Sequence, residues 1–131
     1  MLQLLEKSYF PEVIKTNFIN YLNSKKYDVV IGVEGYYSVL LGIICNSLKS
    51  KVIGWQHNSY YAYFNTPNKY NWRQDKLFEK YIRNLDKYIL LTDEDKYYVE
   101  KKFFANCIRI YNPLSFNSTI KSKCIEKILY Q

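Results

Sequence analysis

Four short apolar runs alternate along the chain with longer stretches in which apolar residues recur at helical spacing. The short runs are Val29–Val33, Val52–Trp55, Lys87–Leu91 and Cys107–Tyr111. Their length and their β-branched and aromatic residues are typical of buried strands. Strands that alternate with helices form βαβ units with right-handed crossovers. The pattern therefore predicts an α/β fold, a Rossmann-like parallel sheet with helices on both faces.

Four amphipathic helices are predicted around these strands, over about 11–26, 38–50, 72–84 and 93–104. Pro11 opens the first helix, where its fixed backbone angle suits the first turn. The apolar face of this helix comprises Ile14, Phe18, Tyr21 and Leu22. In the third helix, Glu79 and Arg83 stand four residues apart, which favours an exposed ion pair. Thr92 begins the fourth helix, and Asp95 three residues later predicts a variant of the capping box.

Polar or small residues follow each predicted strand. They are Glu34 and Gly35 after the first strand, Gln56, His57 and Asn58 after the second, Thr92 after the third and Asn112 after the fourth. Ligands of open α/β sheets bind outside the carboxyl ends of the strands. We therefore take these residues as candidate ligand contacts, and His57 is the only histidine of the chain. The alternative is that they belong to ordinary polar loops. A loop is predicted over Glu34–Tyr37, and a longer one over Tyr60–Asn71 has a length that is often functional.

Composition is consistent with one domain or most of one, since the chain has 131 residues of which 48% are hydrophobic. The cysteines Cys45, Cys107 and Cys124 are widely spaced and odd in number, which predicts neither a metal site nor a disulfide framework. Asp93, Glu94 and Asp95 are interpreted as acidic residues of a helix first turn rather than as metal ligands. No secretory signal or membrane span is predicted.

The formal net charge of +7 comes mostly from lysine. Scattered lysines are ordinarily a solvated surface, and the alternative is an anionic partner such as a membrane surface or a phosphorylated substrate. Only three arginines are present, and no basic run is interleaved with aromatic residues, which argues against a nucleic-acid partner. The fifteen tyrosines are interpreted as compositional bias rather than as functional residues.

Three segments carry a resemblance to a known family. They are Trp55-Gln56-His57, the strand-to-helix junction Leu91–Lys96, and Ile110-Tyr111-Asn112-Pro113-Leu114. In this order and at these separations, within about residues 27–116, the chain resembles glycosyltransferase family 4. It is similar to the second half of the amino-terminal, acceptor-side domain of a GT-B fold enzyme.

The resemblance implies transfer of a sugar from a nucleotide-sugar donor to a glycan or lipid-linked acceptor, as in polysaccharide biosynthesis. It implies a cytoplasmic protein, peripheral at the inner membrane face, with no cofactor and no metal. His57 matches the family histidine beside the donor sugar, and this match makes it the candidate catalytic residue. Asn112 and Pro113 match the segment near the hinge between the two domains.

The chain departs from the family pattern in two places. No strand with a glycine-rich loop precedes Tyr27, and no nucleotide-binding second domain follows. We therefore expect residues 1–117 to be a partial amino-terminal domain and residues 118–131 to be the interdomain linker and the start of the second domain. The expected function is that of a fragment, inactive alone, which meets the donor only with the missing domain. The alternatives are a non-catalytic acceptor-glycan-binding module and an unrelated flavodoxin-like or response-regulator-like domain.

Overall fold

The structure is a computed structural model that describes residues 1–67 and 74–113. Its sheet has the strands β1 (Val29–Val33), β2 (Lys51–Trp55), β3 (Lys87–Leu90) and β4 (Cys107–Arg109). All three neighbouring pairs are parallel, and the strand order in the sheet is β1-β2-β3-β4. The predicted α/β class and parallel sheet are therefore confirmed. The predicted boundary at residue 117 and the predicted linker over 118–131 lie outside the described residues.

Six α-helices and two short 3₁₀ helices are found within the described ranges. They are α1 (Leu2–Tyr9), α2 (Glu12–Lys25), α3 (Glu34–Ile44), η1 (Cys45–Ser47), α4 (Tyr60–Phe64), α5 (Asp75–Tyr81), η2 (Ile82–Asn84) and α6 (Asp93–Phe103). Helix α1 is absent from the prediction. Helix α3 begins at Glu34 itself, so the predicted loop over Glu34–Tyr37 is wrong. The predicted loop after Tyr60 contains the short helix α4, and the predicted start of the third helix at Trp72 lies outside the described residues.

Helix α2 buries part of the predicted face. Leu22 is buried and Phe18 packs against the core, as predicted, whereas Ile14 and Tyr21 are exposed. Lys15 is also buried, and its ammonium lies 3.2 Å from the Glu6 carboxylate of α1 and 2.7 Å from that of Glu12. Paired charges can be buried at a helix junction, so Lys15 shares the buried side of α2 with Phe18 and Leu22.

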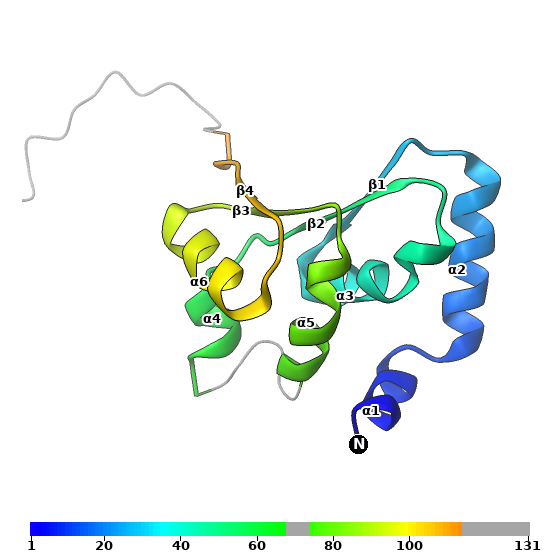
Figure 1. Cartoon of the computed structure of the whole chain (residues 1–131), viewed down its shortest axis with the longest axis horizontal. Helices are drawn as coiled ribbons and strands as arrows, with labels where there is room; N and C mark the ends of the chain where they lie inside the picture. The colour runs from blue at the N-terminus through cyan, green and yellow to red at the C-terminus, as the bar shows by residue number, and fades with distance from the viewer. Residues whose placement is uncertain (68–73, 114–131) are drawn as a thin grey trace, which may run out of the picture.

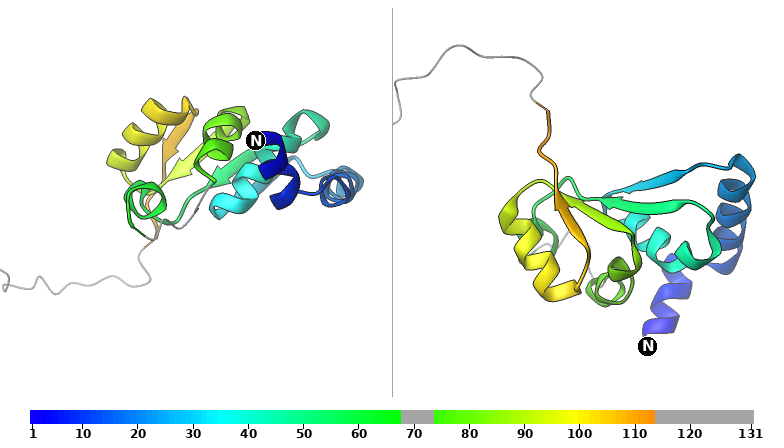
Figure 2. Two further views of the ribbon diagram at one scale, coloured as in Figure 1. Left: turned by 90° about the horizontal axis from the view of Figure 1, so that it is seen from below. Right: turned by 45° about the horizontal axis from the view of Figure 1, so that its top comes forward.

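The main helical layer lies on one face of the sheet (Figures 1 and 2). Helix α3 contacts β1, β2 and α5, while α6 contacts β3, β4, α4 and α5. Right-handed crossovers between strands that follow one another in sheet order put every connecting helix on the same side. The helices that connect the strands therefore lie on one face, which differs from the prediction of helices on both faces.

The core lies between this layer and the sheet, and aromatic rings fill much of it. Tyr63, Phe64, Phe78 and Phe103 are buried, and their rings make edge-on and tilted contacts with centroids 5.1–6.2 Å apart. Gly32 permits the close approach of α3 to β1, because a Cβ there would lie 2.8 Å from the backbone carbonyl of Tyr37. Among the described residues, no helix is both long and apolar enough to cross a membrane.

Candidate functional site

The carboxyl ends of all four strands lie at one edge of the sheet because the strands are parallel. This edge therefore carries the candidate contacts, which are Glu34 and Gly35 after β1, Gln56, His57 and Asn58 after β2, Thr92 after β3, and Asn112 after β4. The prediction that Glu34, His57 and Thr92 share an edge of one parallel sheet is confirmed. The residues at this edge differ in burial and in hydrogen bonding.

Glu34 is the centre of a small polar cluster. Its carboxylate accepts a hydrogen bond from the Tyr63 hydroxyl of α4, and the amide Nδ2 of Asn58 lies 3.5 Å from both carboxylate oxygens. Its backbone φ is 66°, in the left-handed region that costs energy for a residue with a side chain. Gly35, the next residue in the first turn of α3, is buried. The fold thus holds this carboxylate at the end of β1 at a cost in backbone strain.

Gln56 is buried and holds neighbouring residues in place. Its side chain is fully buried, its Oε1 accepts from the Tyr88 hydroxyl at 2.9 Å, and its Nε2 donates to the Asn58 carbonyl at 2.7 Å. Burial also raises the pKa of Tyr88, so this phenol stays protonated as a donor. The predicted direct substrate contact at Gln56 does not fit this placement. Instead, Gln56 fixes the backbone of the segment that presents His57 and Asn58.

His57 is exposed and stacks on the indole ring of Trp55, with ring centroids 4.9 Å apart and an angle of 24° between the planes. No hydrogen bond joins its imidazole to Glu34, Asn58 or any other residue that the structure describes. Its position at the edge agrees with the prediction, and its ring nitrogens face no fixed partner there. The same edge therefore contains one tightly held group, the Glu34 carboxylate, and one free imidazole.

Thr92 caps helix α6, as predicted. Its hydroxyl accepts from the Asp95 backbone N–H at 3.0 Å and donates to the Asp95 carboxylate at 2.6 Å. The other Asp95 oxygen accepts from the Tyr60 backbone N–H at 2.7 Å and so joins α6 to α4. The Thr92 hydroxyl is therefore already engaged. Asn112 is exposed and makes no side-chain hydrogen bond within the described ranges.

A hollow between α4 and α6 was not identified from the sequence. It has a volume of about 340 Å³ and is lined by Ser59, Tyr60, Tyr61, Asn65, Glu94 and Tyr98, together with Asp95. Tyr61 is 63% exposed, and the Tyr98 ring stacks on Tyr60 with centroids 5.2 Å apart. The only signal for it in the sequence is the pair of dipeptides Tyr60-Tyr61 and Tyr97-Tyr98, which compositional bias also explains.

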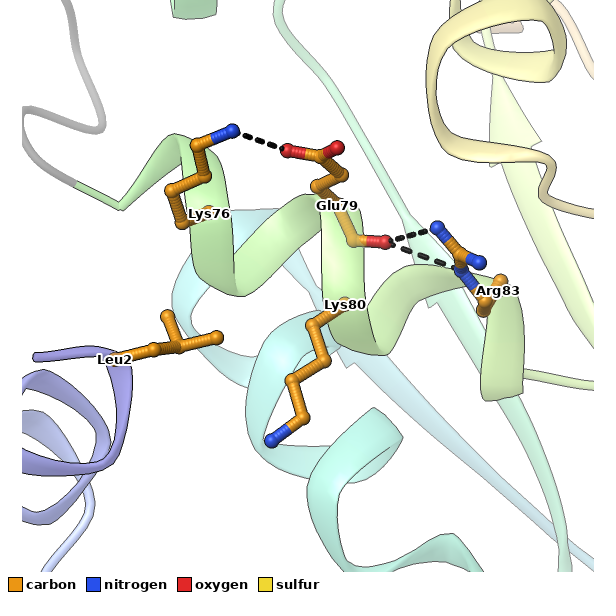
Figure 3. Close-up of a pocket in the computed structure, with 5 residues that line it drawn as sticks. All are labelled: Leu2, Lys76, Glu79, Lys80 and Arg83. Atoms are coloured by element: carbon orange, nitrogen blue, oxygen red, sulfur yellow. Dashed lines mark hydrogen bonds and ion pairs between the residues drawn. The ribbon is translucent and has the colours of Figure 1, made fainter.

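A second hollow, of about 350 Å³, lies between α1 and α5 on the helical side of the sheet (Figure 3). Two of the charged side chains on its wall contact Glu79. Lys76 contacts the Glu79 carboxylate at 2.9 Å, and the Arg83 guanidinium donates to the Glu79 backbone carbonyl at 2.8 and 3.1 Å. The predicted Glu79–Arg83 ion pair is therefore wrong, because Arg83 binds the helix backbone instead. Lys80, also on this wall, lies 3.9 Å from the Glu6 carboxylate of α1, so the wall carries three cations and one carboxylate.

Comparison with known proteins adds no identity. No family model, no curated protein and no solved structure matches the chain.

Proposed function

We propose that the carboxyl edge binds sugar hydroxyls and that the chain is the acceptor-side part of a glycosyltransferase. In this proposal the complete enzyme transfers a sugar from a nucleotide-sugar donor to a glycan or lipid-linked acceptor, in polysaccharide biosynthesis. The observation that supports it is the cluster of Glu34, Asn58 and Tyr63 at the carboxyl edge, and the tyrosine-lined hollow between α4 and α6 adds to it.

The chemistry of the edge suits a neutral, hydroxyl-rich ligand. A carboxylate accepts hydrogen bonds and an amide both donates and accepts them, as sugar hydroxyls require. Small-molecule sites combine aromatic walls with a few fixed polar groups in hollows of about 300–1,000 Å³, and the hollow between α4 and α6 meets this description. The strained backbone of Glu34 supports the same interpretation, since such strain clusters at ligand-binding positions.

The charge of the edge favours the acceptor over the donor. Glu34, Asp93, Glu94 and Asp95 are all acidic, and the guanidinium of Arg109, the one that the described residues place nearby, is paired with Asp93. A nucleotide diphosphate would be repelled by these carboxylates. The donor diphosphate is therefore held by polypeptide outside these residues in this proposal.

His57 is the proposed catalytic residue at the donor side of the edge. In the transfer, the acceptor hydroxyl oxygen forms a bond to the anomeric carbon, the bond from that carbon to the diphosphate oxygen breaks, and the hydroxyl proton passes to the leaving diphosphate oxygen. Catalysis needs the acceptor to be oriented and the leaving diphosphate to be stabilised. The free imidazole is available to hydrogen-bond the donor sugar or its phosphate, while the Glu34 cluster orients the acceptor.

The second candidate is a non-catalytic module that binds acceptor glycans only. The acidic edge favours it, because the described residues offer no unpaired cation there for a diphosphate. Both candidates locate the chain at the cytoplasmic face of the membrane, where lysines would attract anionic lipid. If acidic vesicles leave the sedimentation of the chain unchanged, the proposed location at the membrane is contradicted.

The test is an NMR titration of the ¹⁵N-labelled chain with an oligosaccharide panel and, separately, with uridine- and guanosine-diphosphate hexoses. We expect oligosaccharides to shift the amides of Glu34, Asn58 and Tyr61, and the effect to vanish in Glu34→Gln but persist in the control Glu100→Gln. Binding of nucleotide sugars by the isolated chain would contradict the assignment of the acceptor side. No shift with any oligosaccharide would contradict both candidates.

The Glu34→Gly variant separates function from folding. Glycine adopts a positive φ without strain, so the gain in backbone energy should offset the lost bond to Tyr63 and leave the free energy of unfolding within about 1 kcal/mol of the parent. Oligosaccharide binding should be lost at the same time. Lost binding with unchanged stability supports a ligand role, whereas a marked loss of stability would make Glu34 a structural residue.

A further inference from the structure

The face of the sheet opposite the helical layer is apolar, and we call it the open face. By register it carries Val29, Ile31 and Val33 from β1, Ile53 and Trp55 from β2, Ile89 from β3 and Ile108 from β4. The three β1 side chains are 46%, 47% and 43% exposed, respectively. Ile89 in the middle of the face is buried. The exposed apolar area thus increases toward β1.

Strand β1 also has a free edge. The Lys51 N–H donates to the Asp28 carbonyl at 2.9 Å, so the even-numbered residues of β1 bond to β2 and the backbone groups of Val29, Ile31 and Val33 point outward. No other strand of the described ranges pairs with them. The strand contains no lysine, proline or bulge, the usual protections of an exposed edge. An apolar edge beside an apolar face is therefore available for strand addition.

We propose that the open face and the free edge of β1 bind a strand-and-helix unit from polypeptide outside these 131 residues. The strand of that unit extends the sheet in parallel with β1. Its amphipathic helices lie on the open face and run antiparallel to the strands, as the helices of βαβ units do. The proposal rests on the sheet alone and stands whether or not the edge binds sugars.

The dimensions of the face fit helices better than a second copy of the chain. Parallel sheets occur almost only with helices over both faces. Four strands about 4.8 Å apart span about 19 Å, which is the width of two helices packed about 10 Å apart. The strands have five, five, four and three residues and the longest are about 17 Å long, so the footprint is at most roughly 300 Å². The face alone is therefore well short of the roughly 800 Å² that each partner buries in a standard stable complex.

The charges at the rim agree with this direction of the helices. Lys51 and Lys87 occupy open-face positions at the amino ends of β2 and β3. A helix antiparallel to the strands ends there, and cations stabilise the negative end of its dipole. The Lys51 ammonium contacts Asp86 at 3.0 Å yet remains 74% exposed, so it is still accessible to a helix end.

A strand added beside β1 would also complete the candidate site. Helices of that unit on the open face require, under the right-handed crossover rule, that its strands follow one another away from β1. The strand order then reverses at β1, and ligands of doubly wound sheets bind in the crevice at such a reversal. Glu34, at the carboxyl end of β1, would form one wall of that crevice. This consequence rests on the proposed function, whereas the docking itself does not.

The test begins with a photoreactive benzoylphenylalanine at Ile31 of the full chain, produced and irradiated in the cells that make the protein naturally. The control carries the same group at Tyr97, which is exposed on α6. We expect Ile31 adducts to map to one polypeptide segment whose apolar residues recur at helical spacing next to a β-branched run. A synthetic peptide of that segment should slow amide exchange of Ile31 and Val33 at least tenfold, without changing that of Val30 and Gly32.

A second variant excludes misfolding as the explanation. Ile31→Lys should lose the peptide effect, while its circular dichroism matches that of Tyr97→Lys, which keeps the effect. Adducts to a second copy of the chain, adducts to lipid alone, or no adduct above the Tyr97 background would overturn the proposal. A captured segment that fails to slow exchange would overturn it as well. None of these outcomes changes the oligosaccharide titration, so the two proposals fail separately.

Discussion

The two faces of the sheet have similar composition and opposite surroundings. On the covered face, Tyr88 and Leu90 of β3 are almost completely buried under the helical layer, whereas Ile31 and Val33 of β1 on the open face are each more than 40% exposed. The apolar run of β1 is thus explained on one side only by contacts within the described residues. The difference teaches that an apolar strand indicates the surroundings that a sheet requires, and at β1 the described residues provide them on one face only.

The largest expected difference between the faces is in stability. Leu90→Ala should lower the free energy of unfolding by about 2–5 kcal/mol, because it leaves a cavity in a packed core. Ile31→Ala on the open face should cost less than about 1 kcal/mol, since that side chain is already half in water. Urea unfolding of the two variants and the parent measures both values. Equal losses would mean that the open face is packed in solution and would contradict the comparison.

The polar interior of the covered face should give the next largest effect. Tyr88→Phe leaves the buried Gln56 Oε1 without its donor, which should cost about 1–3 kcal/mol. It should also loosen the segment that carries His57 and Asn58, because Gln56 holds the Asn58 carbonyl. Urea unfolding and the NMR line widths of residues 57–59 measure the two effects. The matched control is Tyr97→Phe on the exposed side of α6, and an equal loss there would refute this role for the hydroxyl.

A smaller, pH-dependent effect is expected where β2 meets β3 at the amino edge. Hydrogen bonds from the Val52 N–H at 2.8 Å and from Lys51 at 3.0 Å lower the pKa of the Asp86 carboxyl below its usual 3.8. A lowered folded-state pKa means that this stabilisation is complete above the unfolded-state value and is lost as the pH falls through the folded-state pKa. Urea midpoints between pH 5 and pH 2.5 should therefore fall less steeply for Asp86→Asn than for the parent. Parallel pH profiles would show that the carboxylate contributes nothing.

Much of this fold follows from local pattern. The runs at 29–33 and 52–55 predict β1 and β2 closely, and Thr92 with Asp95 predicts the start of α6, because strand length and helix capping depend on near neighbours. The burial of Lys15 on α2 was not predictable, because its partner Glu6 lies on another helix. The connecting helices lie on one face because of the order of the strands in the sheet. That order cannot be predicted from the spacing of the strands along the chain.

In the candidate site, too, some features follow from the local sequence and others from contacts between distant segments. The carboxyl edge was predictable, since parallel strands end together. The burial of Gln56 was not, because it depends on Tyr88, 32 residues away. The Glu34–Tyr63 contact and the tyrosine-lined hollow depend on helix α4, whose five residues are too few for a periodic signal. Contacts between segments distant in the chain therefore decide which polar residues face a ligand.

Amide hydrogen exchange along β1 of the isolated chain tests the central claim of a half-covered sheet most directly. We predict that the N–H groups of Val30 and Gly32, which bond to β2, exchange at least about 100-fold more slowly than those of Ile31 and Val33, which point outward from the edge. Equal protection of all four amides would show that the edge of β1 is already paired, and it would contradict the account.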